Sequence, residues 1–520
     1  MRNIKARNRA LTLLAAAALV LAAVPALSAP TTETAETEVM ELKWLGPYYL
    51  DSEPQPPEGN MMQQLIEERF NVKIEIANIS SADNEKLPLW FAEGNTADYV
   101  SVKLAFGQSL VDQGLLRSYP KEWLWEHAPE WADRMEAMFG DRLEREMTYK
   151  GEAWALPYNN WAEVESSYLP LVRKDWMDNL NITEDPVTID EHFELLKQFT
   201  YGDPDGDGKD DTYGMSHISF VYGLGFSWVF AAYGYQDKSF YVKDGQVIYA
   251  NSQDEYKQAL KTLAEWYEAG VIDPTFATNK GGEFYDGWGM GDFGLNWQPP
   301  VALTADTPRG PKQLVWAHTP DAEFAFLPPP KGPDGKYGAA MPYPSLFIFG
   351  NGGAFGHEAS DEKVIKIMQM QNEILADRDL FNTLVYGNEG VHWDRGSEGE
   401  IKIRVEEAKT AHHDGVGFWG RFPILRDEDP TLTSAAREVY DWVASLPVNY
   451  WGVAFTHDGV NEVYTAKRGD LNTISNEFYH KAITGVVDID AAWDQFQADL
   501  NAAGLGEVIA EFQRLYDAMQ

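Results

Sequence analysis

Residues 40–76 read MELKWLGPYYLDSEPQPPEGNMMQQLIEERFNVKIEI, and this stretch decides the fold class. Met40 to Trp44 is a short apolar run of the kind found in buried strands, and Val72 to Ile76 alternates apolar with charged residues as a half-buried strand does. The apolar residues between them are spaced to share one face of a helix: Met62, Leu65, Ile66 and Phe70. Strand, helix and strand at this spacing form a βαβ unit, so the sequence predicts an α/β protein with a mostly parallel sheet.

Helix termini and aromatic stripes mark further helices. Thr188 with Glu191, and Ser252 with Glu255, have the spacing of capping boxes, which satisfy the free N–H groups at the start of a helix. Two more helices are predicted near the end of the chain from apolar residues at helical spacing: Trp493, Phe496, Leu500, Leu505, Ile509, Phe512 and Tyr516. We interpret these stripes as core rather than as ligand platforms.

The composition of the whole chain limits its class. A length of 520 residues predicts two or three domains or lobes. The absence of cysteine excludes disulfides, thiolate zinc sites, iron–sulfur clusters and cysteine nucleophiles. A hydrophobic fraction of 44% with 13% aromatic residues is enough for packed cores and argues against disorder. Lys and Arg number 42 against 81 Asp and Glu, and the resulting formal charge of −39 repels polyphosphate, so no nucleic-acid partner is expected.

The first 29 residues have the layout of a secretory signal peptide. Basic residues between Arg2 and Arg9 precede an apolar run from Leu11 to Val24, and small residues then predict cleavage after about Ser28 or Ala29. Residues 30–39 are expected to form a flexible leader. The mature chain is therefore expected to be periplasmic and soluble, without a lipid anchor because no cysteine follows the apolar run. The alternative is an uncleaved amino-terminal anchor.

The sharpest local motif is the acidic loop 203–211, which reads DPDGDGKDD. Calcium needs six to eight oxygen ligands, which alternate carboxylates and one main-chain carbonyl can supply. The predicted ligands are Asp203, Asp205, Asp207, the carbonyl of Lys209, and Asp211. The loop departs from an EF-hand at its twelfth position, where Gly214 replaces the bidentate Glu. We predict a structural Ca²⁺ site with altered closing ligands, and the alternative is an Asp- and Gly-rich surface turn without metal.

Several stretches, taken in order, resemble the extracellular solute-binding proteins of ABC sugar importers, in particular the large oligosaccharide binders of the alginate and aldouronate type. The stretches that carry the resemblance are residues 87–99, 155–158, 171–180, 186–188, the acidic loop, 267–274, the turn at Pro329, 387–393 and 483–516. The resemblance covers nearly the whole mature chain. It implies a structural role for the calcium loop, a cleft that binds sugar without altering it, and no enzymatic activity.

The resemblance also implies two α/β lobes joined by crossover hinge segments, each lobe with a mostly parallel sheet flanked by helices. The expected N-terminal lobe comprises residues 40–158 and about 315–385, and the expected C-terminal lobe about 165–312 and about 390–520. Crossovers are expected near Pro157–Tyr168, around 300–320 and near 385–395. Ligand binding would shift an open–closed equilibrium by a hinge motion. A membrane permease would then recognise the closed form of the monomeric protein.

A sugar ring presents apolar C–H faces and a rim of hydroxyls, so its receptor needs aromatic plates and fixed hydrogen-bond partners. The predicted aromatic plates lie in loops and at the putative hinge: Tyr48, Tyr49, Tyr158, Trp161, Trp228, Trp297, Trp393 and Trp419. The predicted polar partners are Asp98, Asn160, Arg173, Asn296, Glu389 and His392. For any one of these residues the alternative is core packing or an interlobe salt bridge.

The net charge bears on the choice of ligand. It disfavours polyanionic uronates at long range, so we expect a neutral oligosaccharide, although screening over about 8 Å lets a local Arg override the bulk charge. The same acidity also suits a saline or alkaline habitat.

The main rival is a secreted carbohydrate-active enzyme, a glycoside hydrolase or a calcium-dependent lyase, because these use the same acids, aromatics and calcium. Hydrolysis requires two carboxylates at a set distance across the scissile bond, and no motif singles out such a pair. A secreted adhesion module would show repeats and strand-like alternation, and neither is apparent in the sequence.

Overall fold

A computed structural model describes residues 39–46, 59–77, 79, 86–102, 110–140, 143–158, 167–217, 226–279, 281–304, 310–341, 352–408, 410–450 and 461–518. The predicted signal peptide and nearly all of the leader lie outside these residues. Four predicted ligand residues also lie outside them: Tyr48, Tyr49, Asn160 and Trp161. Among the described residues, no helix combines the length and the apolar character that crossing a membrane needs.

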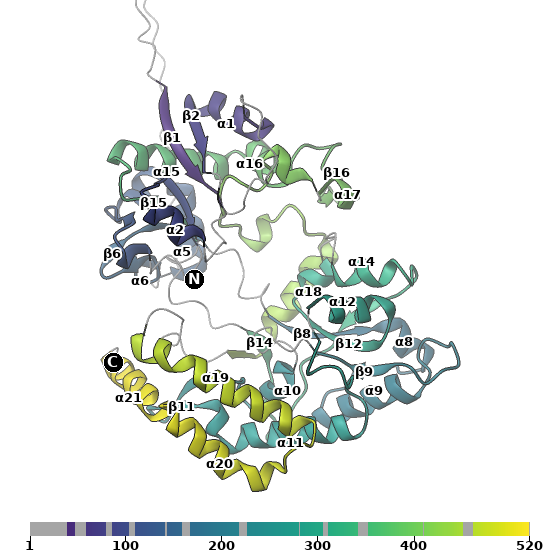
Figure 1. Ribbon diagram of the computed structural model, residues 1–520. Coiled ribbons are helices and arrows are strands. Elements are labelled where there is room, and N and C mark those ends of the chain that lie inside the picture. The colour runs from purple at the N-terminus through teal and green to yellow at the C-terminus, as the bar shows by residue number, and fades with distance from the viewer. Residues whose placement is uncertain are drawn as a thin grey trace, which may run out of the picture. The chain divides into compact units, whose positions relative to one another are not determined.

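The first sheet has the strand order β2-β1-β3-β15-β4, with β7 also paired to β15. Its strands β1, β2 and β15 are labelled in Figure 1. Its strands are β1 (Met40–Leu45), β2 (Val72–Ile76), β3 (Tyr99–Val102), β4 (Leu116–Arg117), β7 (Ala155–Pro157) and β15 (Gly352–Gly356). β1 runs parallel to β2 and β3, which confirms the predicted βαβ unit. β15 runs antiparallel to β3, β4 and β7. The sheet is therefore mixed, and the prediction of a mostly parallel sheet is wrong here because β15 enters from the edge where β3 and β7 end.

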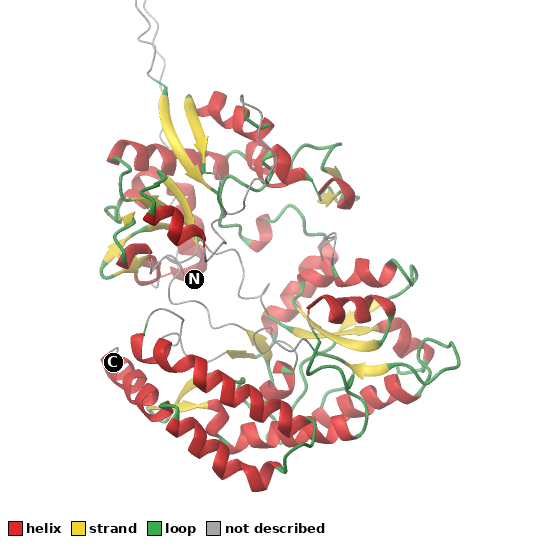
Figure 2. Cartoon of the chain, viewed as in Figure 1, coloured by secondary structure: helices red, strands yellow, loops and turns green. Residues whose placement is uncertain are grey.

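Helices flank this sheet (Figure 2). They are α1 (Met61–Phe70), α2 (Lys86–Ala92), α4 (Trp123–His127), α5 (Pro129–Phe139), α6 (Leu143–Met147), α15 (Asp361–Ala376) and α16 (Arg378–Tyr386). Helix α1 begins where the Asn60 side chain accepts a hydrogen bond from the Gln63 N–H at 2.9 Å, and it ends at Asn71 in the left-handed conformation. Its buried residues Met62, Ile66 and Phe70 join the core under β1 and β2, as the helical spacing predicts.

The second sheet has the order β13-β8-β12-β9 (Figure 1). Its strands are β8 (Leu169–Arg173), β9 (Tyr213–Met215), β12 (Phe293–Gln298) and β13 (Phe324–Phe326). β12 is parallel to β9 but antiparallel to β8, and β13 is antiparallel to β8. This sheet is also mixed. The fold is thus α/β with two mixed sheets, and the mostly parallel pairing expected for both sheets is corrected in each.

The helices around the second sheet carry the aromatic stripes. They are α8 (Lys174–Asn179), α9 (Ile189–Tyr201), α10 (Ser227–Ala232), α11 (Asp254–Glu268), α12 (Gly281–Met290), α13 (Val301–Thr304), α14 (Pro311–Trp316), α19 (Glu462–Ile483), α20 (Ile489–Ala502) and α21 (Leu505–Ala518). The capping box of Thr188 and Glu191 is present at the start of α9. The second predicted box is wrong, because α11 begins after Gln253 without a side-chain cap. Trp493, Phe496 and Phe512 lie in the core, as predicted.

Short elements complete the fold. The remaining pairs are β5 (Thr148–Tyr149) with β6 (Glu152–Ala153), β10 (Phe240–Lys243) with β11 (Gln246–Tyr249), β14 (Ala339–Met341) with β18 (Val448–Tyr450), and β16 (Trp393–Arg395) with β17 (Ile401–Ile403). The remaining helices are α17 (Val405–Ala408) and α18 (Ser434–Ser445), with the 3₁₀ turns at 250–252, 411–414 and 426–428. The chain passes from the first sheet to the second between β7 and β8, and returns to the first sheet at β15.

Two buried histidines in this fold predict a loss of stability in acid. His192 packs against Trp228, and its Nδ1 lies 3.0 Å from the Thr188 carbonyl oxygen. Burial lowers the pKa of His192 to about 4, and that of His217 to about 3. Since the unfolded chain takes up these protons near pH 6.5 and the folded chain does not, the stability is fully present above pH 6.5 and declines as the pH falls toward 4.

We expect His192→Gln to weaken the dependence of the free energy of unfolding on pH. Between pH 7 and 4.5 the His192 contribution is about 2–3 kcal/mol, so the variant should lose that much less than the wild type over this range. Urea unfolding at both pH values measures the difference. His357→Gln, at a solvent-exposed site, serves as the control. An unchanged pH dependence in the His192 variant would contradict the argument.

Candidate functional site

One edge of the first sheet gathers the ends of several strands. Gly352, the first residue of β15, pairs with Val102 at the end of β3 and with Pro157 at the end of β7. β1 is parallel to β3, so it ends at the same edge. We call this the first-sheet edge. The carboxyl ends of strands in open α/β sheets are where such folds bind ligands.

An aromatic cluster underlies the first-sheet edge. The rings of Trp44 and Tyr99 stack with centroids 4.0 Å apart and planes 16° from parallel, and Trp419 lies 5.9 Å from Trp44. All three are about 1% exposed. The indole Nε1 atoms of Trp44 and Trp419 have no hydrogen-bond partner among the described residues. Burial raises the pKa of Tyr99, and the nearby Arg421 charge opposes that rise.

Tyr158 lies at the same edge, directly after β7, and it is partly exposed. The guanidinium carbon of Arg421 lies 5.8 Å from the centroid of its ring, within the range of a cation–π contact. Of the predicted ligand residues, the structure therefore brings Tyr158 and Trp419 to one edge. The sequence reading missed three of their neighbours, Trp44, Tyr99 and Arg421. Trp44 and Tyr99 lie inside strands, where nothing in the sequence distinguishes a core ring from the floor of a site.

The second sheet has a comparable edge, where β12 ends and β8 begins. Gln298 of β12 pairs with Leu169 of β8, and we call this the second-sheet edge. Tyr168 precedes β8 and stacks on Trp297 with ring centroids 6.4 Å apart. Trp228 stacks on the same indole at 6.4 Å. Burial raises the pKa of the partly exposed Tyr168, and Tyr285 nearby raises it further.

Polar groups accompany these rings. The Asn296 side-chain oxygen accepts hydrogen bonds from the Trp297 N–H at 2.7 Å and from Gln298 Nε2 at 3.1 Å. Asn296 Nδ2 and Trp297 Nε1 are buried and have no partner within the described part of the chain. The predicted residues Trp228, Trp297 and Asn296 thus lie together, with Trp228 forming the deepest layer at 0% exposed.

Two predicted polar ligand residues, Asp98 and Arg173, form hydrogen bonds and ion pairs within the protein. Asp98 accepts hydrogen bonds from the Lys43 N–H and from Lys363 Nζ, both at 2.8 Å. Arg173 forms a two-pronged pair with Asp175 at 2.8 and 2.5 Å, and its guanidinium carbon lies 4.9 Å from the Trp176 ring centroid. Both side chains are buried. A role for either one in binding ligand stays a prediction.

Three further predicted residues lie between the end of α16 and the start of β16: Glu389, His392 and Trp393, the first residue of β16. Trp393 Nε1 donates to the Gly387 carbonyl oxygen at 2.7 Å. His392 accepts a hydrogen bond from the Asn388 N–H at 2.9 Å, and its Nε2 lies 3.2 Å from an Asp414 carboxylate oxygen. Glu389 pairs with Arg395 at 2.9 Å. These contacts fix the loop, which lies near the start of α1, where Asn388 Nδ2 is 3.4 Å from Met61 Sδ. The contact of these three residues with ligand also stays a prediction.

The acidic loop folds so that its carboxylates converge. Oxygens of Asp203, Asp205 and Asp207 lie within 4.8 Å of one another. The left-handed backbone at Asp203, with φ of 50°, helps to turn the loop, and the Gly208 N–H donates to Asp203 at 3.1 Å. Burial raises the pKa of Asp205, and the neighbouring acids raise it further. The Lys209 ammonium binds Asp207 and lies 3.9 Å from Asp211. Three converging hard oxygens that attract a cation fit Ca²⁺.

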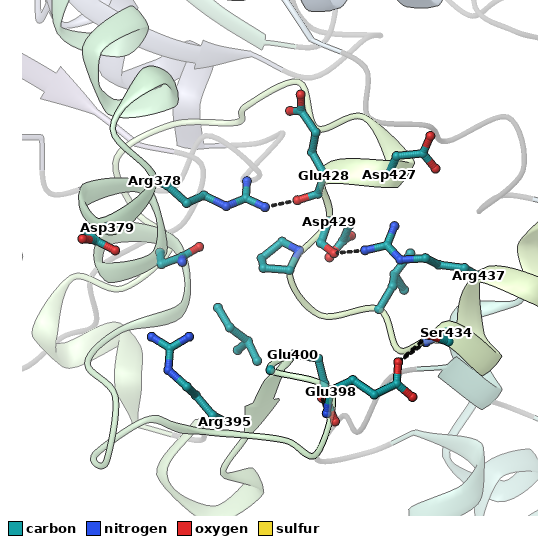
Figure 3. Close-up of a pocket in the computed structure, with 15 residues that line it drawn as sticks. Arg378, Asp379, Arg395, Glu398, Glu400, Asp427, Glu428, Asp429, Ser434 and Arg437 are labelled. Carbon is teal, nitrogen blue, oxygen red and sulfur yellow. Dashed lines mark hydrogen bonds between the residues drawn. The ribbon is translucent and has the colours of Figure 1, made fainter.

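The structure also contains a polar cavity of about 490 Å³ between α16, the β16–β17 hairpin and the start of α18 (Figure 3). Figure 3 shows Arg437 directed at the main-chain oxygen of Asp429, at 2.9 Å, and Glu398 directed at Ser434. Arg378 donates to the Glu428 carbonyl oxygen. No aromatic residue is among the described residues that line it. The cavity therefore lacks the plates that a sugar face needs.

The chain is similar in sequence to the polygalacturonan/rhamnogalacturonan-binding protein YtcQ of Bacillus subtilis strain 168, with 24% identity over 498 residues, 92% of this chain and 91% of YtcQ. It is 23% identical over 517 residues to the fructooligosaccharide ABC transporter substrate-binding protein FusA of Streptococcus pneumoniae, covering 90% of this chain and 88% of FusA. Both relatives carry names of carbohydrate-binding proteins, and FusA is named as the substrate-binding protein of an ABC transporter.

Solved structures agree with this fold. FusA in complex with kestose matches with a TM-score of 0.68 at 18% identity, over 92% of this chain and 99% of FusA. The alginate-binding protein AlgQ2, solved without calcium ion, matches with a TM-score of 0.63 at 18% identity, over 92% of this chain and 99% of AlgQ2. FusA has also been solved as an EF-hand mutant. Residues 455–520 match a family model described as a domain of unknown function, DUF3502.

The Arg173–Asp175 pair gives a testable prediction for this protein. Arg173→Gln leaves the Asp175 carboxylate without its two-pronged partner, so we expect the free energy of unfolding to fall by about 2–4 kcal/mol, slightly less than for a fully buried pair. Denaturant unfolding measures this. The control is Lys174→Gln, which removes a surface pair and should cost less than about 1 kcal/mol. If Arg173→Gln kept its stability but lost sugar binding, the structural role would be contradicted and a role in ligand binding would be supported.

Proposed function

We propose that this chain captures an oligosaccharide between the first-sheet edge and the second-sheet edge and delivers it to an ABC permease. The observation that carries the proposal is the pair of aromatic clusters at these strand ends, each with buried N–H donors that lack a partner among the described residues. The predicted aromatic residues that we place in this site are Tyr158, Trp419, Trp228 and Trp297.

The chemistry of these edges suits a sugar. Partly exposed Tyr158 and Tyr168 can each lie against the apolar face of a sugar ring, while the buried rings beneath them hold the plates in place. Asn296 and Gln298 offer amide groups for hydroxyls at the second-sheet edge. Neither edge needs to change a covalent bond in the ligand.

Two hinged lobes are part of the proposal. Each lobe would be built on one of the two sheets, and the segment between Tyr158 and Tyr168 directly joins the two edges along the chain. A ligand that contacts both edges would favour a closed arrangement, because it gains contacts there that the open one does not offer. The permease would recognise that closed form. Export by the predicted signal peptide and a monomeric state belong to the same proposal.

The relatives do not settle the charge of the ligand. FusA is named for fructooligosaccharides, which are neutral, and YtcQ for polygalacturonan and rhamnogalacturonan, which contain uronates. The net charge of −39 supports a mostly neutral ligand at long range. Contacts at the edges decide what is bound at short range.

The function is tested by a thermal-shift screen over neutral and uronate oligosaccharides, followed by calorimetry and analysis for products. We expect one sugar class to stabilise the protein, with no cleavage. In Tyr168→Ala the affinity for that class should fall about 5- to 20-fold, because one aromatic plate is lost.

The matched control is Tyr201→Ala, which removes a 61% exposed ring on α9. It should leave the affinity unchanged. No stabilisation by any sugar, or equal effects of the two substitutions, would count against the proposed site.

We also propose that the acidic loop binds Ca²⁺ in a structural role. Asp203, Asp205 and Asp207 would supply the first ligands, with the Lys209 carbonyl and Asp211 completing the set that the sequence predicts. Two observations support this Ca²⁺ site: the carboxylates of the loop converge, and structural relatives have been solved as an EF-hand mutant or without calcium ion. Asn179 Nδ2 donates to the Pro204 carbonyl oxygen at 2.9 Å, so an ordered loop is tied to the end of α8.

Calcium removal should therefore lower the melting temperature. At a Ca²⁺ concentration about 100-fold above its dissociation constant, the ion stabilises the fold by about 2.7 kcal/mol. The double variant Asp203→Asn, Asp207→Asn should no longer respond to a chelator, whereas Asp334→Asn, in an exposed turn, should respond as the wild type does. Differential scanning calorimetry with and without chelator measures this, and an equal response in all three proteins would refute a metal site in this loop.

A further inference from the structure

The segment that carries Arg421 is fixed across the first-sheet edge. A Cβ on Gly46, just after β1, would lie 2.5 Å from the Phe418 ring and 2.6 Å from the Phe418 carbonyl oxygen, so the two backbones meet closely there. The Trp419 carbonyl oxygen accepts a hydrogen bond from Gln371 Nε2 at 2.8 Å. Arg421 is therefore presented from a rigid support next to Tyr158 and Tyr99.

Arg421 has no carboxylate partner among the described residues, in a chain with 81 acids. Its Nε is fully shielded from solvent and donates to no acceptor in that part of the chain. Three other arginines near this sheet are paired with carboxylates: Arg69 lies 2.7 Å from Glu373, Arg117 2.5 Å from Asp361, and Arg134 3.0 Å from Glu428. The guanidinium of Arg421 instead lies over the face of Tyr158.

An arginine in this state fits a particular kind of ligand group. A shielded donor without an acceptor is costly in the folded protein, so an acceptor from outside is favoured at this position. The guanidinium presents parallel N–H groups in a rigid fork that matches a carboxylate, and the pair is charge-assisted. A hydroxyl satisfies only one of these donors at a time. Within the screening length of about 8 Å, one local cation outweighs the distant acids of the surface.

We propose that Arg421 is the residue that selects the ligand, by receiving the carboxylate of a uronate unit whose ring lies against Tyr158. The inference rests on the proposed function and makes its substrate class more specific: an oligosaccharide that carries at least one uronic acid. It departs from the neutral ligand expected from net charge, because that expectation concerns long-range repulsion and this contact is local.

The test uses pairs of ligands that differ only in charge. The probes are trigalacturonate and aldotriouronate, each also as its methyl ester, with kestose as a neutral sugar. We expect the wild type to prefer at least one acid over its ester by about 10- to 100-fold in calorimetry, the range of a charge-assisted hydrogen bond. In Arg421→Gln the preference should vanish while any affinity for the ester remains.

Two control variants separate selection from folding. Arg514→Gln removes an exposed, ion-paired arginine and should keep the preference for the acid. Arg421→Lys keeps the charge without the fork, so it should retain only part of the preference, and it remains informative if Arg421→Gln does not fold. Melting temperatures without sugar check folding.

The possible results are distinct. An acid-to-ester ratio that is the same in the wild type and both Arg421 variants overturns the inference. Binding of kestose or the esters without binding of the acids also overturns it, but leaves the proposed function standing. If none of the sugars binds, the inference and the proposed function fall together.

Discussion

The first-sheet edge depends on the close packing of one late strand, β15. It adds to β3, β4 and β7 at once, although those strands lie more than 190 residues earlier in the chain. Only glycine fits at three of its positions. A Cβ would lie 2.1 Å from the Leu156 carbonyl oxygen at Gly352, 2.3 Å from the Tyr99 ring at Gly353, and 2.0 Å from the Ala97 carbonyl oxygen at Gly356. A side chain at Gly353 would displace Tyr99, and with it the ring that stacks on Trp44.

Much of each aromatic cluster is buried rather than exposed. Trp44, Tyr99 and Trp419 are buried at one edge, and Trp228 and Trp297 at the other, while Tyr158, next to Arg421, and Tyr168, stacked on Trp297, are partly exposed. A buried ring that packs on several neighbours is held in one orientation, so the partly exposed ring above it needs little ordering when a ligand arrives. Under the proposed function, the buried rings therefore fix the orientation of the site, and the partly exposed rings contact the ligand.

The sequence predicts the parts of this structure that are local. The spacing of Met62, Ile66 and Phe70 gives α1, and Thr188 with Glu191 gives the start of α9, because both signals lie within a few residues. The alternating acids of the 203–211 loop likewise converge as the motif suggests. The mixed sheets were not predictable, since the direction of β15 is set by where the chain returns after its excursion through the second sheet. Arg421 was missed for the same reason: it has no carboxylate partner within the described part of the chain, and only the folded chain shows which acids are near.

Charge acts on this protein both at long range, through the net charge of its surface, and at short range, through individual ion pairs. These two effects have different consequences for ligand binding. Over the surface, the excess of acids repels anions at long range, and salt weakens this repulsion. Inside the fold, single charges are fixed by partners, as Asp98 is by Lys363 and Arg173 is by Asp175. A charge already paired in this way has little to offer a ligand, because binding would first have to break the pair. Under the proposed function, the groups that recognise a sugar are instead the donors at the strand ends that lack a partner among the described residues, and each of these costs stability until a ligand satisfies it.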